Sequence, residues 1–179
     1  MPDTPAAGDV ATPVVTYPPG PYGTRICARF EPFTLDRCNG TPWSFANDGW
    51  AETSATVVII SAVWCVPCQM EARQIESELG PYRERGVRIV QILVQNADRT
   101  AITPGPCQAW VDRYQLQIPE LMDPEQILQP YYPGLAFPGN LIVDHSGRIR
   151  YRAYGSEAGL NAIKVALDDV LARPDTCTP

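Results

Sequence analysis

The sequence is poor in lysine and histidine and has no long apolar run. Lys164 is the only lysine beside 13 arginines, and with 20 acidic residues the net charge is -6. The arginines are scattered, so the chain lacks the basic cluster of a nucleic-acid-binding surface. No apolar run approaches the roughly 20 residues of a membrane span, and no basic segment followed by an apolar one opens the chain. We therefore expect no nucleic-acid partner, and we expect any signal or membrane anchor to have been removed ahead of residue 1.

The scarcity of histidine also limits metal binding. A structural zinc ion needs four cysteine or histidine ligands, whereas the chain has one Cys-x-x-Cys pair and a single histidine, His145. His145 lies between Asp144 and Ser146, where a solvated turn residue is expected. The sequence predicts no metal site and no cofactor.

The chain does contain a Cys-x-x-Cys motif, Trp64-Cys65-Val66-Pro67-Cys68. It follows an apolar, β-branched run at residues 56–63 and precedes a helical pattern at residues 69–79. Two residues between the cysteines let the sulfurs form and break a bond with little backbone movement. At a helix N-terminus Cys65 would be an exposed thiolate near neutral pH, and the more covered Cys68 would resolve the mixed disulfide. Glu71, three residues after Cys68 on the helix, could carry its proton.

Four further cysteines, Cys27, Cys38, Cys107 and Cys177, are candidates for structural disulfides, which persist in oxidising compartments. Three pairings are possible. We prefer Cys27 with Cys38, the closest pair in sequence, which leaves Cys107 for Cys177. Buried free thiols in a cytosolic protein are the alternative.

Composition divides the chain into three parts. Residues 1–24, rich in proline, are expected to be a flexible tether, residues 25–173 a domain and residues 174–179 a short tail. Strand-helix-strand order predicts a parallel right-handed crossover between the central strands. We expect hairpins at residues 33–45 and 137–154, strands at 56–63 and 87–94, and helices at 69–79, 107–116, 123–129 and 156–173. In the second of these helices, 107–116, Val111 and Tyr114 would face inward.

The motif Trp64-Cys65-Val66-Pro67-Cys68 after a buried strand resembles that of the thioredoxin superfamily. The resemblance is greatest to the TlpA/ResA-like branch of extracytoplasmic thiol-disulfide oxidoreductases, a redoxin group related to AhpC/TSA proteins. The resemblance covers roughly residues 30–172 and implies a three-layer α/β/α sandwich with a mixed central sheet and an N-terminal β-hairpin extension. It matches Pro138 to a cis-proline facing the dithiol, where relatives often have Thr in place of Phe137. It also supports the role of Glu71, since the buried strand aspartate of thioredoxins is replaced by Ile59.

The resemblance implies a protein-disulfide reductase located outside the cytoplasm. Its partners would be a disulfide-bearing protein substrate and an upstream thiol electron donor. Trp64 and Pro67 would flank the site, and the backbone at Phe137 beside Pro138 would pair with an extended substrate segment. Two alternatives stay open: a thiol peroxidase of the peroxiredoxin type, whose Pro-x-x-x-Thr-x-x-Cys pattern is absent, and a tethered binding module with a static disulfide.

Overall fold

A computed structural model describes residues 16–177, in which seven strands form one mixed sheet in the order β2-β1-β5-β4-β3-β6-β7. The central strand β3 pairs parallel with β4 and antiparallel with β6. The strands are β1 (Thr34–Arg37), β2 (Pro42–Ser44), β3 (Ala55–Ser61), β4 (Val87–Leu93), β5 (Glu120–Met122), β6 (Gly139–Asp144) and β7 (Ile149–Tyr154).

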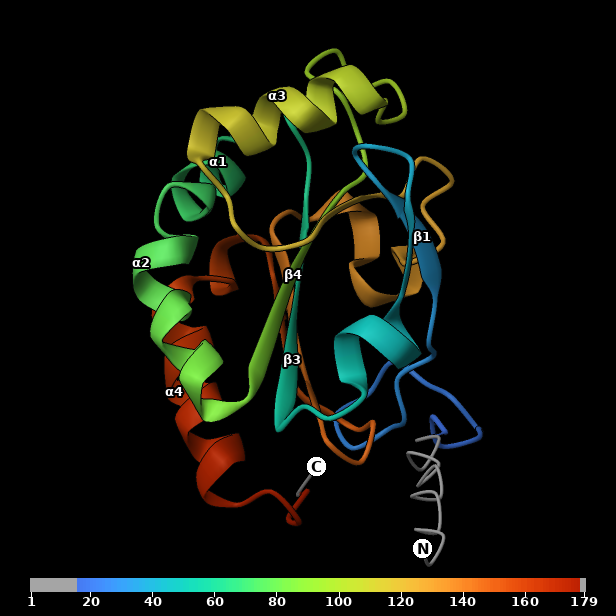
Figure 1. Ribbon diagram of the computed structural model, residues 1–179, viewed down its shortest axis with the longest axis vertical. Helices are drawn as coiled ribbons and strands as arrows, with labels where there is room; N and C mark the ends of the chain where they lie inside the picture. Colours follow the sequence, from blue (N-terminus) through green and yellow to red (C-terminus); the bar gives the residue numbers. More distant parts are fainter. Residues whose placement is uncertain (1–15, 178–179) are drawn as a thin grey trace, which may run out of the picture.

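The α-helices share one side of the sheet. Figure 1 shows α1, α2 and α4 stacked along this side and α3 across its upper end. The π-helix η1, coloured cyan in Figure 1, and the 3-10 helices coloured orange cover the opposite side, so the domain has three layers. The helices are α1 (Val66–Ala72), α2 (Ile75–Leu79), α3 (Pro104–Tyr114), α4 (Leu160–Ala172), and the short η1 (Phe45–Trp50), η2 (Gly80–Arg85), η3 (Gln129–Tyr131), η4 (Pro133–Leu135) and η5 (Gly155–Glu157).

The core forms around β3, whose seven residues are all buried. A strand with helices on one face and aromatic side chains on the other must be apolar on both, which explains its continuous β-branched run. Each aliphatic side chain buried in this way contributes about 1.5–3 kcal/mol. Because β3 holds the dithiol loop at its carboxyl end, this burial fixes where the motif lies.

The register across β3 brings polar side chains into one row beneath the helices. Ile59 pairs with Gln91 of β4 and with Asn140 of β6, so these three side chains lie on the same face. Gln91 accepts a hydrogen bond from the indole N–H of Trp110 on α3, at 3.1 Å. The amide of Asn140 donates to Glu71 on α1. The crossovers through α1 and α3 therefore lie on the same side, as right-handed connections to successive parallel strands require.

Most of the predicted elements are confirmed, and two predictions about the middle of the chain are wrong. Residues 123–128 form turns and no helix, because the Asp123 carboxylate accepts the backbone N–H groups of Ile127 and Leu128 and closes the loop locally; Gln129 begins the short helix η3. The inward residues of α3 are Cys107 and Trp110, while the predicted pair from the same helix is only half-buried. Strand β5, which precedes Asp123, was not predicted.

The preferred pairing of the outer cysteines is also wrong. Cys38 is bonded to Cys107, and Cys27 is bonded to Cys177. Cys38 follows β1, near one edge of the sheet. Helix α3 covers this part of the sheet and carries Cys107. Cys27 lies beside the start of β7, where its N–H donates to the carbonyl of Ile149 and where the chain returns after α4. Both bonds thus join segments that only the tertiary fold brings together.

The two ends of the described chain lie against the domain. Tyr17, within the predicted tether, stacks edge-to-face on Trp50 and donates a hydrogen bond to the carbonyl of Phe30 at 2.8 Å. The rest of the predicted tether, residues 1–15, lies outside the described residues. The predicted tail is described as far as Cys177, whose disulfide ties it to the domain. None of the helices in residues 16–177 is both long and apolar enough to cross a membrane.

Candidate active site

The dithiol occupies the first turn of α1, as predicted. Cys65 is the N-cap residue with extended backbone, and its sulfur accepts the N–H of Cys68 at 3.2 Å. The two cysteines form a disulfide with their Cα atoms 5.3 Å apart. Pro67, inside the first turn, has no N–H to leave unsatisfied and a φ already suited to the helix. The backbone therefore offers the Cys65 sulfur a donor, and the same donor would stabilise a thiolate there.

The prediction that Cys65 is exposed is wrong for this oxidised form. Cys65 is 2% exposed and Cys68 is fully buried. The disulfide directs the Cys65 sulfur toward Cys68, whose side chain belongs to the buried stripe of α1. The two residues between the cysteines, Val66 and Pro67, are exposed, and the exposed fraction of Val66 is 62%. A partner would thus meet an apolar surface immediately beside a recessed sulfur.

Glu71 is a buried carboxyl one helical turn from Cys68. It is 7% exposed, and its Oε1 accepts a hydrogen bond from the Asn140 amide at 3.0 Å. Within the described residues its Oε2 has no hydrogen-bond partner. Burial raises the pKa of Glu71 to about 7, and the hydrogen bond from Asn140 opposes part of that rise. A carboxyl that changes protonation near neutral pH is suited to proton transfer.

The mouth of the site is aromatic. Trp64 packs edge-to-face on Phe137 with ring centroids 5.9 Å apart, and Phe137 is 7% exposed. The Phe137–Pro138 bond is cis, as the resemblance implied, and Pro138 is buried. The predicted site residues from the dithiol loop and from the segment before β6 are therefore brought together at one end of the sheet.

Sequence reasoning missed several polar residues that hold this arrangement. The indole N–H of Trp64 donates to Gln95 at 2.9 Å, and the Arg99 guanidinium lies 4.3 Å from the centre of the Trp64 ring. Asn140, the partner of Glu71, was also missed. One signal was available, since Asn140 is a polar residue near the start of the strand that follows Pro138, directly before the apolar residues 141–143.

A cavity of about 350 Å³ lies beside Trp64 on the α3 side. Aromatic and aliphatic side chains dominate its wall, which also contains Gln69 and, from α3, Arg113. Its lining residues are Val63, Trp64, Gln69, Ala97, Pro106, Ala109, Trp110, Arg113 and Tyr114. Elsewhere in residues 16–177, no three His, Cys, Asp or Glu side chains gather in a way that could hold a metal ion.

Comparison with known proteins gives consistent matches. Residues 26–152 match the AhpC/TSA family. The thiol-disulfide oxidoreductase ResA of Halalkalibacterium halodurans is 30% identical over 86 residues, which is 48% of this chain and 46% of ResA. The chain thus spans about half the length of the curated relatives that it matches.

Solved structures show the same fold at lower identity. A thiol:disulfide interchange protein of the thioredoxin family from Chlorobium tepidum superposes with a TM-score of 0.65 at 18% identity, covering 82% of this chain and 97% of the other. StoA from Bacillus subtilis superposes with a TM-score of 0.59 at 18% identity, covering 76% and 96% of the two chains. The fold of this chain is therefore thioredoxin-like.

Proposed function

The chain belongs to the AhpC/TSA family, and from that premise we propose that it is a thiol-disulfide oxidoreductase acting on disulfides of other proteins. The observation that carries the proposal is the Cys65–Cys68 disulfide at the first turn of α1 with the buried carboxyl of Glu71 beside it. A disulfide needed only for stability would not require a neighbouring group that exchanges protons near pH 7.

In the reducing direction, the reaction starts from the dithiol. The Cys65 thiolate, stabilised by the N–H of Cys68, attacks a sulfur of the substrate disulfide, and the other substrate sulfur leaves as a thiolate. Cys68 then attacks the Cys65 sulfur of the mixed disulfide. The substrate is released with both thiols reduced, and the Cys65–Cys68 bond forms. An upstream thiol donor restores the dithiol by the reverse exchange.

Glu71 has a defined task in this sequence. Cys68 must lose its proton before it can attack, and it is too buried to lose it directly to water. Residues three apart on a helix are surface neighbours with Cβ atoms about 5–6 Å apart, so the Glu71 carboxylate is the nearest base on α1. In the opposite direction the protonated carboxyl returns the proton to the leaving Cys68 thiolate.

The aromatic mouth would bind the substrate segment. Val66 and Pro67 offer exposed apolar contact, and Trp64 shields the sulfurs from water on the side facing Phe137. We propose that the backbone at Phe137, beside the cis bond to Pro138, pairs with an extended substrate strand. The bulk of Phe137 would then limit which side chains the substrate can carry at that point.

We also propose that the protein works outside the cytoplasm. All six cysteines lie within residues 16–177 and all are paired, which suits an oxidising compartment. The donor and the substrate are a dithiol protein and a disulfide-bearing protein respectively.

The test is insulin reduction with dithiothreitol as the electron source. We expect the wild type to accelerate it, and we expect Cys65→Ser to be inactive and Cys68→Ser to accumulate a mixed disulfide with insulin at Cys65. The Cys27→Ser/Cys177→Ser double variant is the matched control and should remain active. If the wild type consumes hydrogen peroxide efficiently but does not reduce insulin, the chain is a thiol peroxidase. If it does neither, the Cys65–Cys68 bond is static and the proposal fails.

A further inference from the structure

Glu120 is a second buried carboxyl, far from Glu71 along the chain. It begins β5, is 4% exposed, and within the described residues neither of its carboxyl oxygens has a hydrogen-bond partner. No ion pair involves it among those residues. Burial raises the pKa of Glu120 well above its ordinary value, which favours the protonated form of the carboxyl. A polar group buried without a partner is costly, and its presence calls for a role.

The sheet register puts Glu120 beside the Cys38–Cys107 disulfide. Strands β1 and β5 are antiparallel, with Asp36 opposite Met122 and Arg37 opposite Leu121, so Cys38 stands opposite Glu120. The N–H of Cys38 donates to the Glu120 carbonyl at 3.3 Å, and the Cys38 sulfur lies 3.7 Å from the same oxygen. Opposite residues of an antiparallel pair project to the same face with Cβ atoms about 4.5–5.5 Å apart. The carboxyl and the disulfide therefore share the space under α3.

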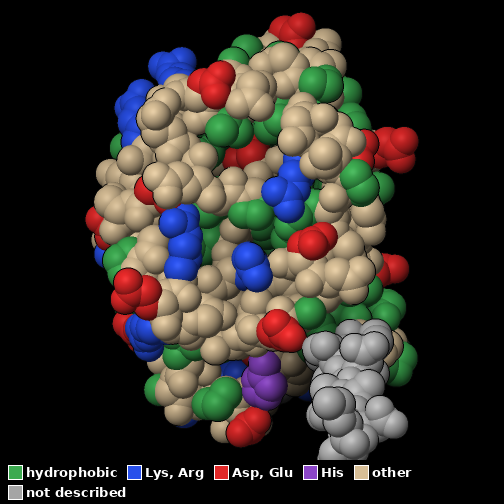
Figure 2. Space-filling model, in the orientation of Figure 1, with side chains coloured by type: hydrophobic (Ala, Val, Ile, Leu, Met, Phe, Trp, Pro, Cys, Tyr) green, Lys and Arg blue, Asp and Glu red, His purple; other side chains and the backbone are tan. Residues whose placement is uncertain are grey.

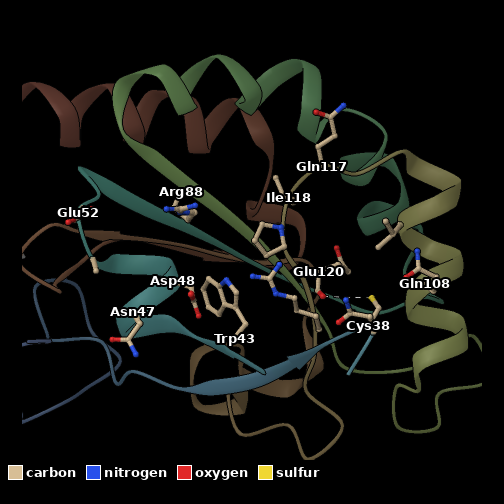
Figure 3. A pocket seen from close by; sticks show the side chains of 15 residues that line it. Cys38, Trp43, Asn47, Asp48, Glu52, Arg88, Gln108, Gln117, Ile118 and Glu120 are labelled. Atoms are coloured by element: carbon tan, nitrogen blue, oxygen red, sulfur yellow. Dashed lines mark hydrogen bonds between the residues drawn. The ribbon is translucent and has the colours of Figure 1, made fainter. Parts of the chain in front are cut away.

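This disulfide is accessible from one side only. A cavity of about 780 Å³ opens between β1, η1 and α3, and both Cys38 and Glu120 line it, whereas Cys107 does not. Figure 2 shows this face hollowed, with basic and acidic side chains around the hollow. Figure 3 shows Cys38, just after β1, and Glu120 of β5 at the cavity wall, with Gln108 of α3 to their right. Cys38, which is 7% exposed, is therefore the member of the pair that a small thiol entering here would meet.

The cavity carries little net charge to select among thiols. Its other charged side chains are Arg37 of β1, Arg88 of β4, Asp48 of η1 and Glu52 after η1. From α3 it receives only Gln108 and Val111. Apart from Glu120, two positive and two negative side chains line the cavity, which favours neither sign of charge on the thiol.

We propose that Cys38–Cys107 is a second redox-active disulfide, which exchanges with low-molecular-weight thiols through this cavity and uses Glu120 as its proton donor. A thiolate attacks Cys38 and forms a mixed disulfide, the Cys38–Cys107 bond breaks, and its electron pair leaves on the Cys107 sulfur. Glu120 protonates that sulfur and later recovers a proton from solvent. A second thiolate attacks the mixed disulfide, and the oxidised thiol dimer leaves while Cys38 takes a proton from water. Two thiols are oxidised and one disulfide is reduced.

The third disulfide is an internal control. Cys27 and Cys177 are half-buried and so more accessible than Cys38 and Cys107. The nearby Asp144 side chain accepts hydrogen bonds from Ser146, Arg148 and Arg150. Reduction of this bond should depend on access and on thiolate concentration, and not on Glu120.

The experiment uses the full chain and 2-mercaptoethanol at pH 7, with timed alkylation and mass mapping of each cysteine, in wild type and in Glu120→Gln. We expect the variant to open Cys38–Cys107 at least tenfold more slowly while Cys27–Cys177 opens at an unchanged rate. A slowing of threefold or more that is confined to Cys38–Cys107 supports the proposal. A smaller slowing, or opening of Cys38–Cys107 only when circular dichroism shows the whole domain unfolding, overturns it.

A second measurement covers the case in which Glu120→Gln does not fold. In the wild type, the rate constant for opening Cys38–Cys107 is measured as a function of pH and divided by the fraction of 2-mercaptoethanol present as thiolate. This normalised rate constant should fall as rising pH removes the Glu120 proton. The corresponding constant for Cys27–Cys177 should stay level. Equal pH dependence of the two bonds overturns the proposal. Insulin reduction, which depends on Cys65, is a separate readout, so this proposal and the proposed function can fail independently.

Discussion

Replacing Glu71 by Gln should change how the stability of the oxidised protein depends on pH. The amide keeps the shape and can still accept the Asn140 hydrogen bond, but it cannot ionise. In the wild type, burial raises the pKa of Glu71 from its ordinary value of 4.5 to about 7. At about 1.4 kcal/mol for each pKa unit, ionising this buried group costs the folded state about 3 kcal/mol relative to the unfolded state.

The sign and the pH window follow from proton binding. Between pH 4.5 and about 7 the unfolded chain has lost the Glu71 proton and the folded chain has kept it, so wild-type stability falls as pH rises. Above about pH 7 both states are ionised and this contribution is constant. Glu71→Gln lacks the whole effect, so its stability relative to the wild type should increase by about 3 kcal/mol between pH 4 and pH 8.

The assay is urea denaturation with all three disulfides intact, from pH 4 to pH 9. Glu84→Gln is the matched control, because Glu84 is exposed and forms no ion pair among the described residues, and its curve should stay parallel to the wild type. If the Glu71→Gln and wild-type curves are parallel as well, Glu71 titrates like a solvated carboxyl and its assignment to proton transfer is wrong.

Three further predictions follow from the same geometry. Asn140→Leu removes the hydrogen bond that lowers the pKa of Glu71, so the pH at which release of a mixed disulfide accelerates should move upward. An unchanged pH profile of the release rate would show that Asn140 does not affect this step. Trp64→Ala should raise KM for insulin about tenfold, roughly 1.4 kcal/mol, and leave exchange with small thiols within a few-fold; equal losses in both assays would argue against a substrate contact. Cys27→Ser/Cys177→Ser should lower the free energy of unfolding by about 3–5 kcal/mol, because the bond closes 150 residues; a loss under about 1 kcal/mol in urea denaturation would contradict this.

The parts of the site that sequence reasoning reached are those set by local pattern. The continuous apolar run of β3 followed by Cys65 and Cys68 determines the strand, the cap and the helix start within a single segment. The spacing of Glu71 from Cys68 determines that they are neighbours on the helix. These relations need no knowledge of distant segments, and the structure contains each of them.

The parts that it did not reach depend on contacts between distant segments. Strand β5 has three residues and begins with a glutamate, so its pattern is too short to distinguish from a loop. The disulfide partners of Cys38 and Cys27 are 69 and 150 residues away, and only the packing of α3 and the return of the chain after α4 select them. Asn140 acquires its role because β6 lies next to β3, which the sequence of β6 alone does not state.

The central claim is that the sulfur at the start of α1 is the attacking group. The most direct measurement is the rate of alkylation of each cysteine by iodoacetamide at pH 6.5, after reduction of the Cys65–Cys68 bond in the folded protein. We predict that Cys65 reacts at least ten times faster than Cys68, since its thiolate is stabilised at the helix N-terminus while Cys68 is buried. Equal rates, or faster reaction of Cys68, would contradict the assignment of Cys65 as the nucleophile.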